Sequence, residues 1–233
     1  MDRVRSFGEL AVAWGGNAKA LRWDFVLRWK AIKSLLPKIE PPISALEVGT
    51  GVGHYAIKLA SIGAKVVAVD FCRPLLERGR SRSEALGLDV VWLEAEAENL
   101  PIRSEFCDLV LSVTCIQHLT ALDRQKAAIK EILRVLRPGG IFILVEDTVT
   151  FGGGCVHRGY LLKHSKAAWI QLVESEGGIL EKYLGVSFLR FRKWLPFWTS
   201  AYLDTVIRMT GLFNQFACVT AFKFRARGAK TRV

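Results

Sequence analysis

Apolar runs alternate with helix-forming segments along the middle of this chain, and this alternation limits its fold more than any other feature. The apolar runs occupy 43–48, 65–70, 89–93, 108–113 and 141–146, and helical patterns occupy 53–62, 73–86 and 121–136. Strands that alternate with helices form βαβ units and a parallel sheet that is covered on both faces. The sequence therefore predicts an α/β fold with a doubly wound sheet, whose ligand lies at the carboxyl ends of the strands.

The segment before this core has its own pattern. Residues 21–36 place apolar side chains close to helical spacing, and three prolines follow within the next six positions. Proline ends a helix because it cannot donate the backbone hydrogen bond. We therefore expect residues 1–42 to form an N-terminal helical extension or lid, and residues 43–233 to form the main domain.

The segment after the fifth apolar run adds further elements. Ser165 is placed to cap a helix, and residues 179–188 and 217–224 have the composition of two more strands. We expect a mostly parallel, seven-stranded, Rossmann-like sheet, with the last strand as an antiparallel edge. Between these two strands, residues 189–215 are aromatic and basic. They are predicted to form an amphipathic insertion over the acceptor site, although a helix packed on the core would have the same pattern.

Charge is unevenly distributed along the chain. The net charge is +11, and residues 182–233 carry 10 basic side chains against 1 acidic. Such a tail favours an anionic membrane surface, RNA or an acidic partner, while a solvated surface is the plainer alternative. The five cysteines have no metal-site spacing, and the chain begins without a signal-peptide pattern. The expected location is cytoplasmic, or peripheral to a membrane.

The first apolar run leads into a turn with glycine at alternate positions. Glu47 lies within the run, and Gly49, Gly51 and Gly53 come before the helical pattern begins. A dinucleotide fingerprint needs its third glycine where His54 stands, and a P-loop needs a lysine that does not follow here. Glycine lets the backbone approach a ligand and present N–H groups at a helix start. The turn therefore favours a different nucleoside ligand.

Five segments in order resemble the motifs of class I S-adenosylmethionine-dependent methyltransferases. The glycine turn "ALEVGTGVG" resembles the first motif, and it is followed by "VVAVD", "LEAEAENLPI", "FCDLVLSVTCIQHL" and "LRVLRPGGIFILVE". The branch most similar in these segments includes the ubiquinone and menaquinone C-methyltransferases. This resemblance implies S-adenosylmethionine as the cofactor and S-adenosylhomocysteine as its product.

The resemblance also implies which residues hold the cofactor. Asp70 would accept hydrogen bonds from the ribose hydroxyls, and Phe71 would lie beside the adenine. Glu96 would face the adenine amino group, and the backbone amide of Ala97 would meet the ring. The implied cofactor residues are Glu47, Gly49, Gly51, Gly53, Asp70, Phe71, Glu96, Ala97 and Thr114.

Candidates for the acceptor side follow from position alone. His118 comes just after the fourth strand, where it is a candidate catalytic base, although it could equally cap the next helix or order the loop. Tyr160 and His164 lie in the loop expected after the fifth strand, a region that often lines acceptor pockets. Trp14 resembles an aromatic residue that closes over the cofactor, but it could also be a core residue.

The chemistry of the acceptor is the least constrained part. The sequence has neither an "NPPY"-type motif nor a Pro-Cys pair for attack on a pyrimidine. This favours a methyltransferase that acts on a small-molecule or lipid-like acceptor. Two alternatives stay open, an RNA or protein methyltransferase that uses the basic C-terminal segment, and a non-catalytic protein that only binds the cofactor.

Overall fold

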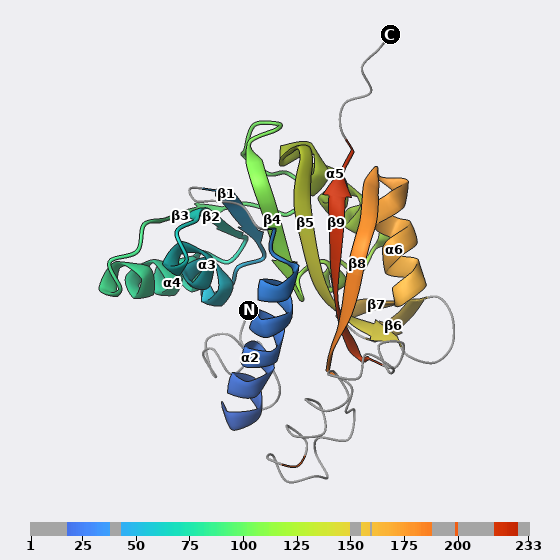
Figure 1. Cartoon of the computed structure of the whole chain (residues 1–233), viewed down its shortest axis with the longest axis horizontal. Coiled ribbons are helices and arrows are strands. Elements are labelled where there is room, and N and C mark those ends of the chain that lie inside the picture. The colour runs from blue at the N-terminus through green and yellow to red at the C-terminus, as the bar shows by residue number, and fades with distance from the viewer. Residues whose placement is uncertain are drawn as a thin grey trace.

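The computed structural model describes residues 18–37, 43–149, 155–158, 160–187, 199 and 217–227. Helices and strands alternate through this part of the chain as the sequence predicts (Figure 1). The helices are α2 (Ala18–Leu35), α3 (His54–Ser61), α4 (Arg73–Ala85), α5 (Leu122–Val135) and α6 (Lys166–Ser175), and a 3-10 turn, η3, spans Ile116–His118. The strands are β1 (Ser44–Val48), β2 (Lys65–Asp70), β3 (Val90–Glu94), β4 (Cys107–Val113), β5 (Leu136–Val149), β6 (Cys155–Arg158), β7 (Leu161–Ser165), β8 (Gly178–Ser187) and β9 (Val219–Ala226).

The main sheet is mostly parallel and doubly wound, which confirms the predicted fold class. Strands β3, β2, β1, β4 and β5 are neighbours in that order and run parallel. Strand β9 pairs antiparallel with both β5 and β8. Figure 1 shows this path running across the molecule from β3 to β8. These seven strands form the sheet that the sequence predicts, and the described residues add the pair β6 and β7.

The last strand is antiparallel as expected, but it is not at the edge. Strand β9 lies between β5 and β8, so the edge position belongs to β8. The physical reason is visible in the burial of the two strands. Consecutive residues Val219, Thr220, Ala221 and Phe222 are all buried, as both faces of an interior strand must be, whereas the middle of β8 is largely exposed.

The segment after β5 is also more ordered than the predicted loop. Strands β6 and β7 form an antiparallel hairpin, and β7 continues the sheet from the end of β5. The predicted helix follows as α6, and the Ser165 hydroxyl caps it by accepting a hydrogen bond from the Ala168 N–H at 3.2 Å. Tyr160 therefore lies at the hairpin turn, and His164 lies within β7.

Helices cover both faces of the sheet and bury two apolar clusters. One cluster joins Leu27 and Ile32 of α2 with Tyr55 of α3, and the opposite cluster joins Ile129 of α5 with Trp169 of α6. All five side chains are at most 5% exposed. Helix α2 is thus packed into the core of the domain. Its predicted role within a lid of residues 1–42 stays a prediction, because most of that lid lies outside the described residues.

The fold gathers the ends of the parallel strands at one edge. Asp70 is in register with Glu94, and Val113 with Val145, so the residues that follow β1, β2, β3 and β4 come close together. Strand β1 has β2 on one side and β4 on the other, which makes the β1/β4 boundary the point where the strand order reverses. Ligands of open α/β sheets bind at such a point. Within the described residues, no helix is long and apolar enough to cross a membrane.

Candidate functional site

The glycine turn between β1 and α3 has two packed positions and one open position. All three glycines have positive φ, 72° at Gly49, 55° at Gly51 and 75° at Gly53. A Cβ on Gly49 would come within 2.2 Å of the Cys115 sulfur, and one on Gly53 within 2.1 Å of the Trp92 ring. A Cβ on Gly51 would meet nothing within 4 Å. The turn therefore packs closely at its two ends and leaves space for a ligand at its centre.

Glu47 supports this turn from inside the sheet. Its side chain is buried, and its Oε2 accepts hydrogen bonds from the Thr50 hydroxyl and the Ala56 N–H, both at 2.6 Å. Burial raises the pKa of Glu47 to about 8, against the opposing effect of these two hydrogen bonds. The described contacts of Glu47 are thus within the turn and the first turn of α3, and its predicted contact with the cofactor stays a prediction.

Asp70 and Phe71 follow β2 beside the open glycine. One carboxylate oxygen of Asp70 accepts from the Gly51 N–H at 2.8 Å, and the other accepts from the Cys72 N–H at 3.0 Å. Burial raises the pKa of Asp70, and the backbone N–H groups around it oppose that rise. The Phe71 ring is 67% exposed. A carboxylate with spare acceptor capacity next to an exposed aromatic face suits a ribose and its base.

The loop after β3 is tied to α5 by an arginine that sequence reasoning missed. Arg124 pairs with Glu96 at 3.0 Å and with Glu98 at 2.5 Å. Ala97 between them is partly buried against the apolar cluster under α5. The Glu96 side chain is 63% exposed, so it is open to a ligand while Arg124 holds the loop in place. An exposed pair of this kind adds little stability.

Thr114 directly follows β4 and has a strained backbone conformation. Its φ is +49°, which a β-branched residue rarely adopts. Its N–H donates to the Val145 carbonyl at 2.7 Å, and its hydroxyl accepts a hydrogen bond from Nη1 of Arg28 at 3.2 Å. Strain of this kind persists only where the surroundings fix the residue, and it concentrates at functional sites.

The turn that follows Thr114 is capped by a buried acid on β5. Oε1 of Glu146 accepts hydrogen bonds from the Cys115 N–H at 3.1 Å and from the Ile116 N–H at 2.8 Å. Glu146 is fully buried, and burial together with the neighbouring Asp147 raises its pKa to about 8. Glu146 is therefore mostly uncharged at neutral pH, and it directs the chain from β4 into η3.

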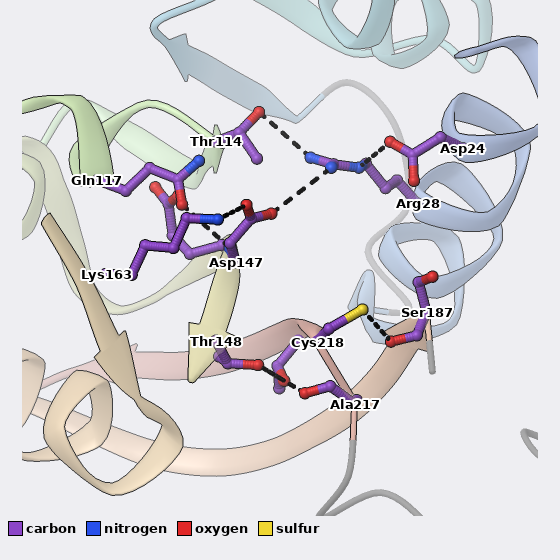
Figure 2. Close-up of polar contacts among 12 residues, drawn as sticks. Asp24, Arg28, Thr114, Gln117, Asp147, Thr148, Lys163, Ser187, Ala217 and Cys218 are labelled. Carbon is purple, nitrogen blue, oxygen red and sulfur yellow. Dashed lines mark hydrogen bonds and ion pairs between the residues drawn. The ribbon is translucent and has the colours of Figure 1, made fainter. Parts of the chain in front are cut away.

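A cluster of charged side chains lies under this turn, and we call it the Arg28 cluster. Arg28 pairs with Asp24 at 2.7 Å and lies 4.0 Å from Asp147, while Lys163 pairs with Asp147 at 2.5 Å. The Asp147 N–H donates to the Gln117 amide oxygen at 3.3 Å. Figure 2 shows Arg28 reaching from α2 towards Thr114 and Asp147. Sequence analysis missed this cluster, although Asp24 and Arg28 are four residues apart on the buried stripe of α2.

His118 lies at the end of η3 and stacks on Tyr160. The two ring centroids are 5.8 Å apart with an angle of 7° between the planes, and Tyr160 is 66% exposed. Neighbouring protein partly desolvates the imidazole and lowers the pKa of His118; Lys163 lowers it further, whereas Asp147 and a hydrogen bond with the Tyr160 backbone raise it. A neutral imidazole at the surface of the site can accept a proton.

Of the two other predicted acceptor residues, the structure describes only His164. His164 is only 4% exposed, its Nε2 lies 2.6 Å from the Gln125 amide oxygen, and its ring packs edge-on against Trp169. These contacts place His164 in the core under α6, so its structural surroundings do not support a substrate role. Trp14 lies outside the described residues, as does the predicted insertion 189–215 except for Thr199.

Comparison with known proteins gives a matching family and several relatives. The family described as "Methyltransferase domain" matches residues 46–144. The chain is 32% identical to a demethylmenaquinone methyltransferase of Thermus thermophilus over 158 residues, which are 66% of this chain and 70% of that protein. It is 30% identical to a tRNA (carboxymethyluridine(34)-5-O)-methyltransferase of Arabidopsis thaliana over 118 residues, which are 51% of this chain and only 27% of the relative.

Solved structures share the fold at low sequence identity. An S-adenosylmethionine-dependent methyltransferase from Mesorhizobium loti has a TM-score of 0.63 and 14% identity, with 87% of this chain and 99% of that chain covered. The [4+2]-cyclase SpnF has a TM-score of 0.68 and 18% identity, with 93% and 84% covered. One fold can therefore carry different reactions, and the acceptor chemistry must be argued from the site.

Proposed function

The chain belongs to the methyltransferase domain family and is an S-adenosylmethionine-dependent enzyme, and from this premise we propose that its methyl acceptor is a small apolar or lipid-like molecule. The observation that carries the proposal is the extent of the match to the demethylmenaquinone methyltransferase, which covers 70% of that relative. The match to the tRNA methyltransferase covers 27% of its length. Because the match to the demethylmenaquinone methyltransferase reaches beyond the cofactor-binding core, it favours a small apolar or lipid-like acceptor.

The residues present fit the cofactor. The open face of Gly51, the Asp70 carboxylate and the exposed Phe71 ring lie at the strand ends where a nucleoside would bind. Asp70 would accept from the ribose hydroxyls, and Phe71 would cover one face of the adenine. Glu96 and the Ala97 amide would meet the edge of that ring, and Gly49, Gly53 and Thr114 would lie around the nucleoside.

The chemistry needs little from the protein beyond placement. The bound cofactor supplies an activated methyl group, so the residues of this chain mainly orient the acceptor in line with it and exclude water. When the acceptor's nucleophile carries a proton, His118 takes that proton onto its neutral imidazole as the new methyl bond forms. Tyr160, stacked on His118, would contact the acceptor at the same place.

A second candidate function rests on the basic tail and on the tRNA relative. Residues 182–233 carry 10 basic and 1 acidic side chains, and phosphate binding by such a segment weakens steeply with salt. In the preferred proposal, the same charge brings the enzyme to an anionic membrane surface. Residues 1–17, which include Trp14, and residues 189–215 would then cover the acceptor; apart from Thr199, these residues lie outside those that the structure describes.

A methyl-transfer assay separates these acceptors. The enzyme is incubated with methyl-labelled S-adenosylmethionine and, in parallel, a reduced naphthoquinone with a free ring position, bulk tRNA, or a protein extract. We expect label in the naphthoquinol, and at a cofactor concentration well below the Kd we expect about tenfold or more less label with Asp70→Asn. Label that appears in tRNA, and that disappears as salt rises, would support the second candidate and contradict the first.

A further inference from the structure

We propose that Arg28 is a positioning residue for methyl transfer, which holds the turn from Thr114 to His118 between the cofactor and the acceptor. The proposal rests on the acceptor side assigned above to His118 and Tyr160. Arg28 itself is buried under this turn and acts through Thr114, to which it donates a hydrogen bond at 3.2 Å.

The turn from Thr114 to His118 needs support from outside. Thr114 has a φ of +49°, a conformation that costs a β-branched residue free energy. The Val145 carbonyl and the Glu146 side-chain carboxyl accept hydrogen bonds from the main chain of the turn and fix it on the β5 side. Arg28 supplies a contact from α2, which belongs to a different layer of the fold. Its guanidinium donates a hydrogen bond to the Thr114 hydroxyl.

The same turn contacts both halves of the site. Cys115 follows Thr114 and lies so close to Gly49 that no Cβ would fit between them. His118 is three residues further along and stacks on Tyr160. A shift of Thr114 would therefore change the distance between the glycine turn, where the cofactor binds, and the imidazole on the acceptor side. Methyl transfer is sensitive to such distances.

The three contacts of residue 28 require an arginine. The guanidinium pairs with Asp24 through Nε, donates to Thr114 through Nη1 and faces Asp147 through Nη2. The planar guanidinium can contact partners in three directions at once, whereas a lysine ammonium at the end of a flexible side chain cannot keep the same geometry. Arg28→Lys would therefore preserve the buried positive charge and lose the fixed link from Asp24 to Thr114.

The test compares Arg28→Lys with Arg225→Lys in the full-length protein. Arg225 pairs with Glu181 and the Gly139 carbonyl at the opposite end of the sheet, so it is a control for the same substitution at an exposed position away from the site. We expect Arg28→Lys to lower kcat about tenfold or more, with cofactor Kd and acceptor KM changed less than about threefold. We also expect the amides of residues 114–118 to exchange with solvent about tenfold faster. Arg225→Lys should change neither kcat nor the exchange rate of these amides.

A double-mutant cycle tests whether Arg28 acts through Thr114, and its second variant keeps the proposal testable if Arg28→Lys does not fold. Thr114→Val removes the hydroxyl that accepts from Arg28, and if Arg28 acts through Thr114 the two substitutions together should cost no more than either alone. Unchanged kcat and unchanged exchange in Arg28→Lys would overturn the proposal, as would fully additive effects. If Arg28→Lys unfolds, Thr114→Val alone must reproduce the faster local exchange. The exchange measurement needs no acceptor, so it stands even if the naphthoquinol proposal fails.

Discussion

Among single residues, Asp70 should govern cofactor affinity most directly. Its carboxylate oxygens accept from Gly51 and Cys72, and spare acceptor sites remain for a ribose. Asp70→Asn keeps the shape but replaces one acceptor by a donor, so we expect S-adenosylmethionine to bind about tenfold to a hundredfold more weakly in calorimetry. Asp89→Asn, at an exposed position before β3, is the control. Equal affinity of the wild type and Asp70→Asn would contradict the assigned ribose site.

His118 is the residue whose role depends on pH. Its pKa is lowered from the ordinary value of 6.5, and a base works in its neutral form, so kcat should stay constant above about pH 6.5 and fall as the pH drops through the lowered value. Lys163→Met removes a positive charge that lowers this pKa, so the fall should move to higher pH. His118→Ala should lower kcat by about a hundredfold with cofactor affinity retained. If kcat and affinity fall together, His118 only orders the loop.

Among the elements, the β1–α3 turn allows packing and binding to be separated. Gly53→Ala combines positive φ with a contact of 2.1 Å to Trp92, so it should lower the free energy of unfolding by about 2 to 5 kcal/mol. Gly51→Ala adds its Cβ to open space, so only the conformational cost of about 1 to 2 kcal/mol applies. We expect Gly51→Ala to stay folded and yet lose cofactor affinity. Denaturant titration and calorimetry measure the two effects, and unchanged binding in Gly51→Ala would place the ligand elsewhere.

The hydrogen bonds that Glu146 of β5 accepts at the start of η3 predict that the free energy of unfolding depends on pH. Glu146 has its pKa raised from 4.5 to about 8, so the folded protein binds the proton more tightly than the unfolded chain. Its stabilising effect is complete below about pH 4.5 and is lost as the pH rises through about 8. Glu146→Gln resembles the protonated acid and should therefore be more stable than the wild type at pH 8.5, with a smaller difference at pH 5. Glu84→Gln, on the exposed face of α4, should show no such difference in thermal unfolding.

Elements with both faces buried could be predicted from the sequence, and short or polar ones could not. Strands β1, β2, β4 and β5 are largely continuous apolar runs because a parallel sheet covered by helices buries both faces. The hairpin of β6 and β7 has short strands next to a glycine-rich stretch, which gives the pattern of a loop. The interior position of β9 had a signal, since apolar side chains occur on both of its faces.

The site could be predicted where a motif is local and not where contacts are distant in sequence. Gly51, Asp70 and Phe71 lie in short segments that resemble known motifs. Arg28 and Asp147 are separated by more than a hundred positions, and a single charged residue carries no sign that it will be buried. The spacing of Asp24 and Arg28 among apolar residues was the available signal, because a charged pair on a buried helix stripe needs partners.

For the whole molecule, the aromatic and basic segment near the C-terminus is the predicted contact with a membrane. Trp194, Phe197, Trp198 and Ala201 recur at i, i+3, i+4 and i+7, so a helix there would carry one apolar stripe. Arg190, Arg192 and Lys193 come just before this stripe. Aromatic side chains next to basic ones suit the surface of an anionic membrane, where a lipid-like acceptor would be found. This segment lies outside the described residues.

The corresponding prediction concerns membrane binding by the intact enzyme. Wild-type protein should sediment with anionic vesicles and much less with neutral ones, and Trp194→Ala together with Trp198→Ala should abolish that binding while cofactor affinity is retained. If the double variant unfolds or loses the cofactor as well, the stripe belongs to the core and the membrane proposal is wrong. If it stays folded and loses turnover with no change in vesicle binding, the stripe contacts a soluble hydrophobic acceptor, because its side chains then serve the reaction without serving the membrane.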